Sequence, residues 1–146
     1  MQAKRVHKEQ EGGTIVVCLE TDFLIAILRK DEGAIRKLEE FVERGEALTT
    51  TPINASELFR GAYLSKNIEE NLKAVRGILS RLDLLNFNLV ASEIYGRVCT
   101  ELKKRGCDIG EFDILIASIA LAHNERIITR NVKHFSKIGE LEVESW

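Results

Sequence analysis

The 146-residue sequence has few cysteines, histidines, prolines and aromatic residues: three, three, one and 6% respectively. The cysteines, at positions 18, 99 and 107, form no C-x-x-C pair and therefore indicate reduced thiols in the cytoplasm. The histidines, at positions 7, 123 and 134, have no zinc-ligand spacing. No apolar run approaches the length of a membrane span, and the polar N-terminus lacks the apolar core of a signal peptide. These absences predict a cytoplasmic protein that does not interact with membranes.

The charge is close to balanced, with a formal net charge of −2 and 30% charged residues. This balance argues against a broad surface that coats nucleic acid, but it leaves room for a local basic groove. The polar segment 1–13 ends in Gly-Gly and predicts a disordered or poorly packed leader. We expect residues 14–146 to form a single domain, because a chain of this length can bury a substantial core.

Apolar strand-like runs alternate with amphipathic helical stretches along this domain. Their order, βααβααβααβαβ, predicts an α/β fold in which helices cover both faces of a central parallel sheet, a three-layer α/β/α sandwich. The expected strands are 14–19, 47–50, 84–87, 126–129 and 141–143, and the expected helices are 23–29, 31–44, 52–64, 68–82, 90–105, 111–123 and 131–138.

The segment 111–122 is the most apolar of these helical stretches. From Ile114 to Ala122 only Ser118 is polar, and the alanine content favours a helix buried on nearly every side over a buried strand. Gly110 is the expected N-cap, which places Asp113 in the first turn. An acid in this position commonly complements the helix dipole, and the alternative is a carboxylate that binds a cation.

Polar side chains follow the expected strands or open the helices behind them. In a parallel α/β sheet, the carboxyl ends of the strands and the N-terminal ends of the returning helices lie at one edge, where such folds bind ligands. Each side chain has an ordinary explanation when it is taken singly, such as a solvated helix face or a helix cap. The residues expected to converge at this edge are Glu20, Asp22, Glu57, Asp113, Thr129 and Asn131.

Carboxylates that gather at a partly buried edge repel one another unless a cation is present. Oxygen ligands without histidine or cysteine select hard cations such as Mg²⁺ or Mn²⁺. Such an ion can activate a water molecule and stabilise charge on a phosphoryl oxygen, so the residues predict metal-assisted phosphodiester hydrolysis.

Four segments resemble the successive motifs of PIN-domain proteins, and most closely those of VapC-type toxins: CLETDFLIAILR, NASELFRGAY, IGEFDILIASIALAHN and IITRNVKHFSKI. The resemblance implies the same α/β/α fold and an Mg²⁺- or Mn²⁺-dependent ribonuclease that is commonly dimeric and inhibited by a cognate antitoxin. It places the catalytic positions at Glu20, Glu57, Asp113, Asn131 and Thr129, and the metal ligands at Glu20, Asp113 and Glu57. Asp22, a second acid two residues after Glu20, is a further expected metal ligand that would compensate for the departures from the family pattern.

The sequence departs from the family pattern at two of these positions. Glu20 stands where Asp is usual, and Asn131 stands where Asp is frequent, so the site has one negative charge fewer and a different geometry. Two alternatives therefore stay open beside the toxin ribonuclease: a weakened PIN domain that binds RNA or an antitoxin without cleaving, and a housekeeping RNA-processing nuclease. The cations nearest the motifs are Arg29, Lys30, Arg60 and Arg130. Apolar residues of segments 31–44 and 52–82 either complete the core or form a dimer and antitoxin surface.

Overall fold

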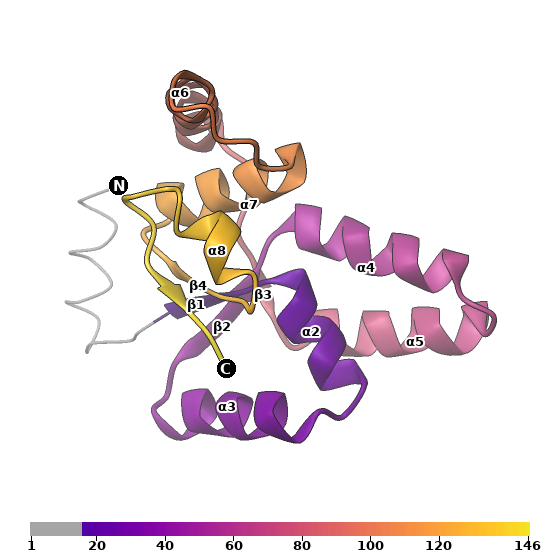
Figure 1. Cartoon of the computed structure of the whole chain (residues 1–146). Helices are drawn as coiled ribbons and strands as arrows, with labels where there is room; N and C mark the ends of the chain where they lie inside the picture. Colours follow the sequence, from indigo (N-terminus) through magenta and orange to yellow (C-terminus); the bar gives the residue numbers. More distant parts are fainter. Residues whose placement is uncertain (1–15) are drawn as a thin grey trace.

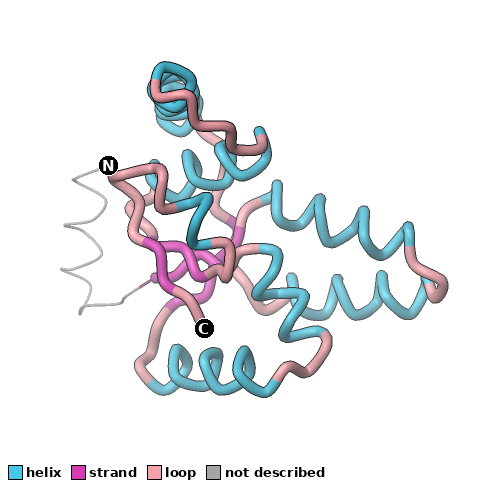
Figure 2. Tube along the Cα trace, viewed as in Figure 1, coloured by secondary structure: helices cyan, strands magenta, loops and turns pink. Residues whose placement is uncertain are grey.

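The computed structural model describes residues 16–146, which are built around a five-stranded sheet. Every neighbouring pair of strands is parallel, and their spatial order is β3-β2-β1-β4-β5. Figures 1 and 2 show the strands at the centre of the molecule with helices around them. The strands are β1 (Val16–Leu19), β2 (Ala47–Thr50), β3 (Asp83–Leu84), β4 (Arg126–Ile128) and β5 (Val143–Glu144).

Helices cover both faces of this sheet, which confirms the predicted α/β/α sandwich. One layer contains α2 (Thr21–Leu28), α3 (Glu32–Glu43), α4 (Pro52–Leu64) and α5 (Ile68–Leu79). The other layer contains α6 (Leu89–Lys104), α7 (Glu111–Ala122) and α8 (Val132–Phe135). The α4–α5 hairpin extends away from the sheet in Figure 1.

Successive side chains of the central strands enter different cores, because neighbouring residues of a strand point to opposite faces. Val17 and Leu19 of β1 pack with α2–α5, whereas Cys18 packs with α6 and α7. In β4, Ile127 belongs to the α6–α7 core and Ile128 to the other. This double burial explains the continuous apolar runs of both strands.

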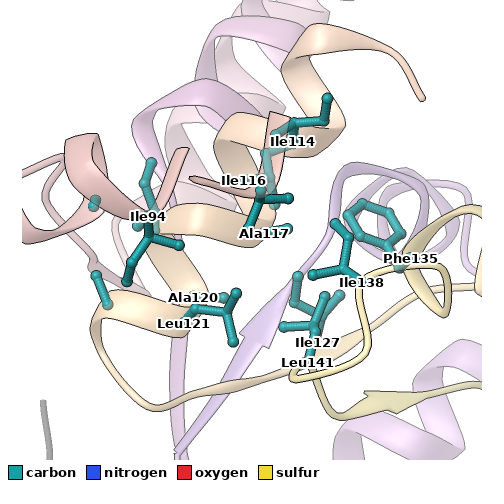
Figure 3. Packing of buried hydrophobic residues seen from close by; sticks show 14 of the residues in the cluster. Ile94, Ile114, Ile116, Ala117, Ala120, Leu121, Ile127, Phe135, Ile138 and Leu141 are labelled. Atoms are coloured by element: carbon teal, nitrogen blue, oxygen red, sulfur yellow. The ribbon is translucent and has the colours of Figure 1, made fainter. Parts of the chain in front are cut away.

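The helix α7 occupies the centre of the second core, as its composition predicts. Its residues Ile116–Ala122 are all buried, and Ser118 satisfies its hydroxyl by donating to the Ile114 carbonyl over 2.7 Å. Figure 3 shows α7 side chains against Ile127, Phe135 and Ile138. The helix begins at Glu111 after Gly110, so Asp113 does lie in its first turn.

Several predicted boundaries need correction. The structure has α5 ending at Leu79 rather than residue 82, and β3 at Asp83–Leu84 rather than 84–87. The strand β5 is Val143–Glu144, shifted from 141–143, and α8 is shorter than 131–138. The predicted leader 1–13 and the first two residues of the strand 14–19 lie outside the described residues. Within residues 16–146, no helix has the length and apolarity needed to cross a bilayer.

Candidate active site

The candidate site lies where β1 and β4 end, at the edge that also holds the first turns of α2, α4 and α7. Glu20 follows β1 and is the N-cap of α2, and Thr129 follows β4. At the next strand, Thr51 follows β2 and caps α4 through a reciprocal pair of hydrogen bonds with Asn54. The parallel topology therefore brings the ends of three neighbouring strands together, as the sequence predicts.

Glu20 is the most deeply buried acid of this edge, with 6% of its surface exposed. Its carboxylate accepts from the Asp22 backbone N–H over 3.3 Å and from Asn54 Nδ2 over 3.3 Å, and the Thr129 hydroxyl lies 3.4 Å away. Burial raises the pKa of Glu20 to about 8, and repulsion from Asp22 acts in the same direction. The Asp22 and Asn54 N–H groups thus hold this carboxyl in place.

Asp22 lies between the other acids and is only partly satisfied. Its Oδ2 accepts from the Thr129 hydroxyl over 3.0 Å and from the Arg130 backbone N–H over 2.8 Å. Its Oδ1 is buried and has no hydrogen-bond partner among the described residues. Because a buried oxygen without a donor is costly in free energy, this atom marks a position where a cation would be stabilising.

Glu57 reaches the site from the second turn of α4 and is held by residues of the β1–α2 junction. The Thr21 hydroxyl donates to Glu57 Oε1 over 2.6 Å and in turn accepts from Asn54 Nδ2 over 2.9 Å. The pKa of Glu57 is raised because the carboxyl is half-buried, and the negative charges of Asp113 and Asp22 add to this effect. Arg60 opposes the shift through its charge without forming an ion pair with Glu57.

Asp113 lies beside a histidine that the sequence analysis did not include in the site. His134 Nδ1 is 3.6 Å from Asp113 Oδ2 and 3.1 Å from Asn131 Nδ2. Burial raises the pKa of Asp113, His134 counteracts this effect, and the charge of Asp22 adds to it. Asn131 occupies the N-cap position of α8, but its side chain contacts His134 and makes no capping hydrogen bond.

The site is thus a group of carboxylates with little positive compensation. No lysine or arginine side chain within residues 16–146 forms an ion pair with Glu20, Asp22, Glu57 or Asp113. The donor set is rich in carboxylate oxygen, which suits a hard divalent cation, and the buried Asp22 Oδ1 supports the same conclusion. Across the described part of the chain, no three His, Cys, Asp or Glu side chains already converge on one ion position.

Residues 17–141 match the PIN domain family. The chain belongs to this family. It is 31% identical over 132 residues to a protein named ribonuclease VapC2 from Rickettsia felis, a match that spans 90% of this chain and 98% of the relative. It is 30% identical over 128 residues to a protein named tRNA(fMet)-specific endonuclease VapC from Shigella flexneri, covering 88% and 96% of the two chains.

Solved structures that are similar to this chain include toxin–antitoxin complexes. A crystal structure of VapBC2 from Rickettsia felis, bound to a DNA fragment of its promoter, contains a chain that superposes with a TM-score of 0.85 at 31% identity. That superposition covers 90% of this chain and 99% of the other. DNA-bound VapBC from Salmonella typhimurium gives a TM-score of 0.83 at 28% identity, covering 91% and 99%. The expected VapC-type PIN ribonuclease is confirmed.

The structure brings the six predicted site residues to one sheet edge, although they are not all in mutual contact. Glu20, Asp22 and Thr129 contact one another directly, and Asn131 donates its backbone N–H to the Thr129 hydroxyl over 3.0 Å. Glu57 and Asp113 are connected to this group through Thr21 and His134, and through mutual charge repulsion.

Three residues that complete the site were missed from the sequence: Thr21, Asn54 and His134. Thr21 and Asn54 are near their partners only in the folded chain, because Thr21 meets Glu57 and Asn54 meets Glu20 across more than 30 positions. The signal for His134 was its spacing, because a residue three positions after Asn131 lies on the same face of a helix.

Proposed function

We propose that this chain is a metal-dependent endoribonuclease that hydrolyses RNA phosphodiester bonds as the toxin of a toxin–antitoxin pair. The observation that carries the proposal is the buried, unpartnered Oδ1 of Asp22 among three acids whose pKa values are raised. An uncompensated group of this kind is destabilising for the fold, which favours a functional origin. Membership of a nuclease family and the ribonuclease names of the relatives support the same activity.

Glu20, Asp22, Glu57 and Asp113 are the residues that would hold the divalent ion, either Mg²⁺ or Mn²⁺. When bound, such an ion supplies a water of lowered pKa and a positive charge opposite the phosphoryl oxygens. Thr129 orients Asp22 with its hydroxyl, and Thr21 does the same for Glu57. Asn131 contributes an uncharged amide where another acid would increase the repulsion.

The activity is tested by incubating a mixed RNA pool with purified protein and Mg²⁺ or Mn²⁺, with EDTA as the metal-free control. We expect metal-dependent cleavage that Asp113→Asn abolishes. Glu111→Gln is the matched variant, because this acid lies in the same helical turn but is exposed and accepts from the Tyr95 hydroxyl instead. Cleavage that survives Asp113→Asn, or that is lost equally in Glu111→Gln, contradicts the assignment of the site.

A weakened PIN domain that binds without cleaving is the second candidate function. The observation that favours it is the burial of Glu20, whose pKa near 8 keeps the carboxyl protonated at neutral pH when no metal is bound. If the wild-type protein does not cleave, Glu20→Asp is the variant to test, since it shortens the side chain by one methylene. Restored cleavage would identify Glu20 as the cause of the loss. A housekeeping role in RNA processing is distinguished from a toxin by the presence or absence of an antitoxin gene next to this one.

We infer that an antitoxin protein is the main partner, since the similar solved structures are VapBC complexes. Exposed apolar side chains at the α4–α5 turn, including Tyr63 and Leu64, are consistent with a protein-binding surface. A homodimer is the expected assembly, and sedimentation at micromolar concentration tests it. RNA cleavage and three free cysteines are compatible with a cytoplasmic location.

A further inference from the structure

A recess of about 550 Å³ lies directly beside the acid cluster and shares Asp22 with it. Its wall is formed by the C-terminal part of α2, the residue that caps α3, the residue after Thr129, and Trp146. Figure 1 shows the chain end at Trp146 close to α2 and α3. The two arginines that line the recess, Arg29 and Arg130, come from different elements and are both exposed.

Arg130 is held at the boundary between the recess and the acids. Its backbone N–H donates to Asp22 Oδ2 over 2.8 Å. Its Nε donates to the Trp146 main-chain oxygen over 3.1 Å, and its guanidinium lies 4.5 Å from the centre of the Trp146 ring. Trp146 is itself packed edge-on against Phe23 with ring centres 5.0 Å apart. A guanidinium fixed in this way loses little conformational entropy when it binds an anion.

Two acids, Asp22 and Asp31, line this recess together with the two arginines. No Asp or Glu side chain of residues 16–146 forms an ion pair with Arg29 or Arg130. The indole Nε1 of Trp146 is buried and has no acceptor in the part of the chain that the structure describes. Asp31, the remaining acid of the wall, already accepts the Ala34 backbone N–H over 2.9 Å at the start of α3.

The recess also depends on a small residue at its rim. A Cβ at Gly33 would lie 3.8 Å from Arg130 Nη2 and 3.7 Å from Trp146 Cδ1. A side chain longer than alanine would therefore extend toward both groups that line the recess. Glycine at position 33 therefore leaves the rim of the recess open.

We propose that the recess binds a backbone phosphate of single-stranded RNA, next along the strand from the phosphate that faces the acid cluster, through the guanidinium groups of Arg29 and Arg130. The proposal rests on the proposed ribonuclease function. A polyanion must approach an edge of uncompensated carboxylates, and cations immediately beside them offset that repulsion. Guanidinium groups bind phosphate oxygens in a bidentate manner, and phosphate contacts position a strand without reading its sequence.

The other two cations near the motifs differ from Arg29 and Arg130 in their position relative to the recess. Arg60 acts on the charge of Glu57 and does not line the recess. Lys30 lies next to Arg29 in the sequence, but it is absent from the wall. The structure thus selects Arg29 and Arg130 from the four candidates of the sequence analysis.

The test measures binding without cleavage. A fluorescently labelled single-stranded RNA is titrated with full-length Asp113→Asn protein in EDTA, and its anisotropy is followed over a series of salt concentrations. Each phosphate contact to a single strand contributes about 0.7 to the slope of log affinity against log salt. We expect Arg29→Gln and Arg130→Gln each to weaken binding and to reduce the slope by about 0.7, and the double variant by about twice as much.

Three further variants test the roles of net charge, of Trp146 and of the open rim. Arg76→Gln removes the same charge from an exposed position of α5 outside the recess and should leave the slope unchanged. Arg130→Lys keeps the charge and should retain the slope, which separates loss of a phosphate contact from disturbance of Trp146. Gly33→Leu, which fills the rim, should weaken binding without any change of charge.

The outcomes separate this proposal from the proposed function. Slopes for Arg29→Gln and Arg130→Gln that equal those of the wild type and of Arg76→Gln would overturn the recess as an RNA site, even if the protein cleaves RNA. Reduced slopes together with an inactive wild-type protein would support the recess and reject the nuclease. Equal losses in all three arginine variants would indicate a general charge effect and would also overturn the proposal.

Discussion

Two groups of acidic side chains lie along the same sheet and differ in their cations. At the candidate site, no lysine or arginine of residues 16–146 forms an ion pair with Glu20, Glu57 or Asp113. Where β4 begins, Arg126 donates to Glu46 through Nη2 over 2.8 Å and to Glu144 through Nε over 3.0 Å. We refer to Lys37, Glu46, Arg126 and Glu144 as the paired cluster.

The comparison shows that burial alone does not decide the ionisation of these acids. In the paired cluster, burial would raise the pKa of Glu144, but hydrogen bonds from Lys37 and Arg126 lower it below its ordinary value. At the candidate site, burial is reinforced by neighbouring acids, and the pKa values rise. The paired cluster therefore stabilises the fold near neutral pH, whereas the candidate site opposes folding until a cation binds.

The largest effect on stability should come from breaking the paired cluster. Arg126→Met leaves the carboxylate of Glu46, whose side chain is only 1% exposed, without its closest cation. We expect the free energy of unfolding to fall by about 3–5 kcal/mol, the range measured when one partner of a buried ion pair is removed. Urea unfolding at neutral pH measures this change.

The matched control is the double variant Arg126→Met with Glu46→Gln, in which no charge is left unpaired between these two positions. It should recover a substantial part of the lost stability, because the unpaired buried charge is the main cost. If the single and double variants are equally destabilised, the loss arises from packing against Phe41, over whose ring the Arg126 guanidinium lies at 5.5 Å.

A divalent ion should act on the candidate site with the next largest effect. At a free concentration about 100 times its Kd, Mn²⁺ should raise the free energy of unfolding by about 2.7 kcal/mol. The increment should be larger at alkaline than at acidic pH, because protons compete for the same carboxylates. Thermal unfolding with and without Mn²⁺ measures it, and Arg126→Met should show the same increment because that change lies outside the site. A pH-independent increment would contradict binding at these acids.

The sequence predicts only part of the difference between the two clusters. The alternation of strands and helices placed Glu20, Asp22 and Thr129 at one edge, because strand ends follow directly from topology. The contacts that adjust their charge are long-range: Thr21 meets Glu57 across 36 positions, and Arg126 meets Glu46 across 80. Asn54 shows the same limit, since its capping role follows from its neighbours but its contact with Glu20 depends on the packing of α4. The hydrophobic periodicity of the sequence predicts helices and strands, but it does not predict these long-range contacts between side chains.

Neutralising one acid of the site should stabilise the protein in a pH-dependent manner. The pKa of Glu20 is raised from 4.5 to about 8, so the folded state binds more protons than the unfolded state between these values. Stability conferred by the protonated carboxyl is therefore lost as the pH rises through this range. Glu20→Gln should exceed the wild type by about 2 kcal/mol above pH 8 and by much less near pH 5, since relaxation reduces the full effect of the shift. Urea unfolding at both pH values measures this, and equal gains would exclude ionisation as the cause.

The smallest expected effect concerns His134, whose proximity lowers the pKa of Asp113 against the effect of burial. In His134→Ala, Asp113 should retain its proton to a higher pH, and because only the ionised carboxylate binds a cation, the pH midpoint of Mn²⁺ binding should rise slightly. Lys133→Gln is the matched control, because it removes an exposed cation from the same short helix. If the pH midpoint of Mn²⁺ binding falls in His134→Ala, the charged imidazole repels the ion in the wild-type protein. An upward shift in His134→Ala alone would instead identify His134 as the residue that keeps Asp113 available for the metal.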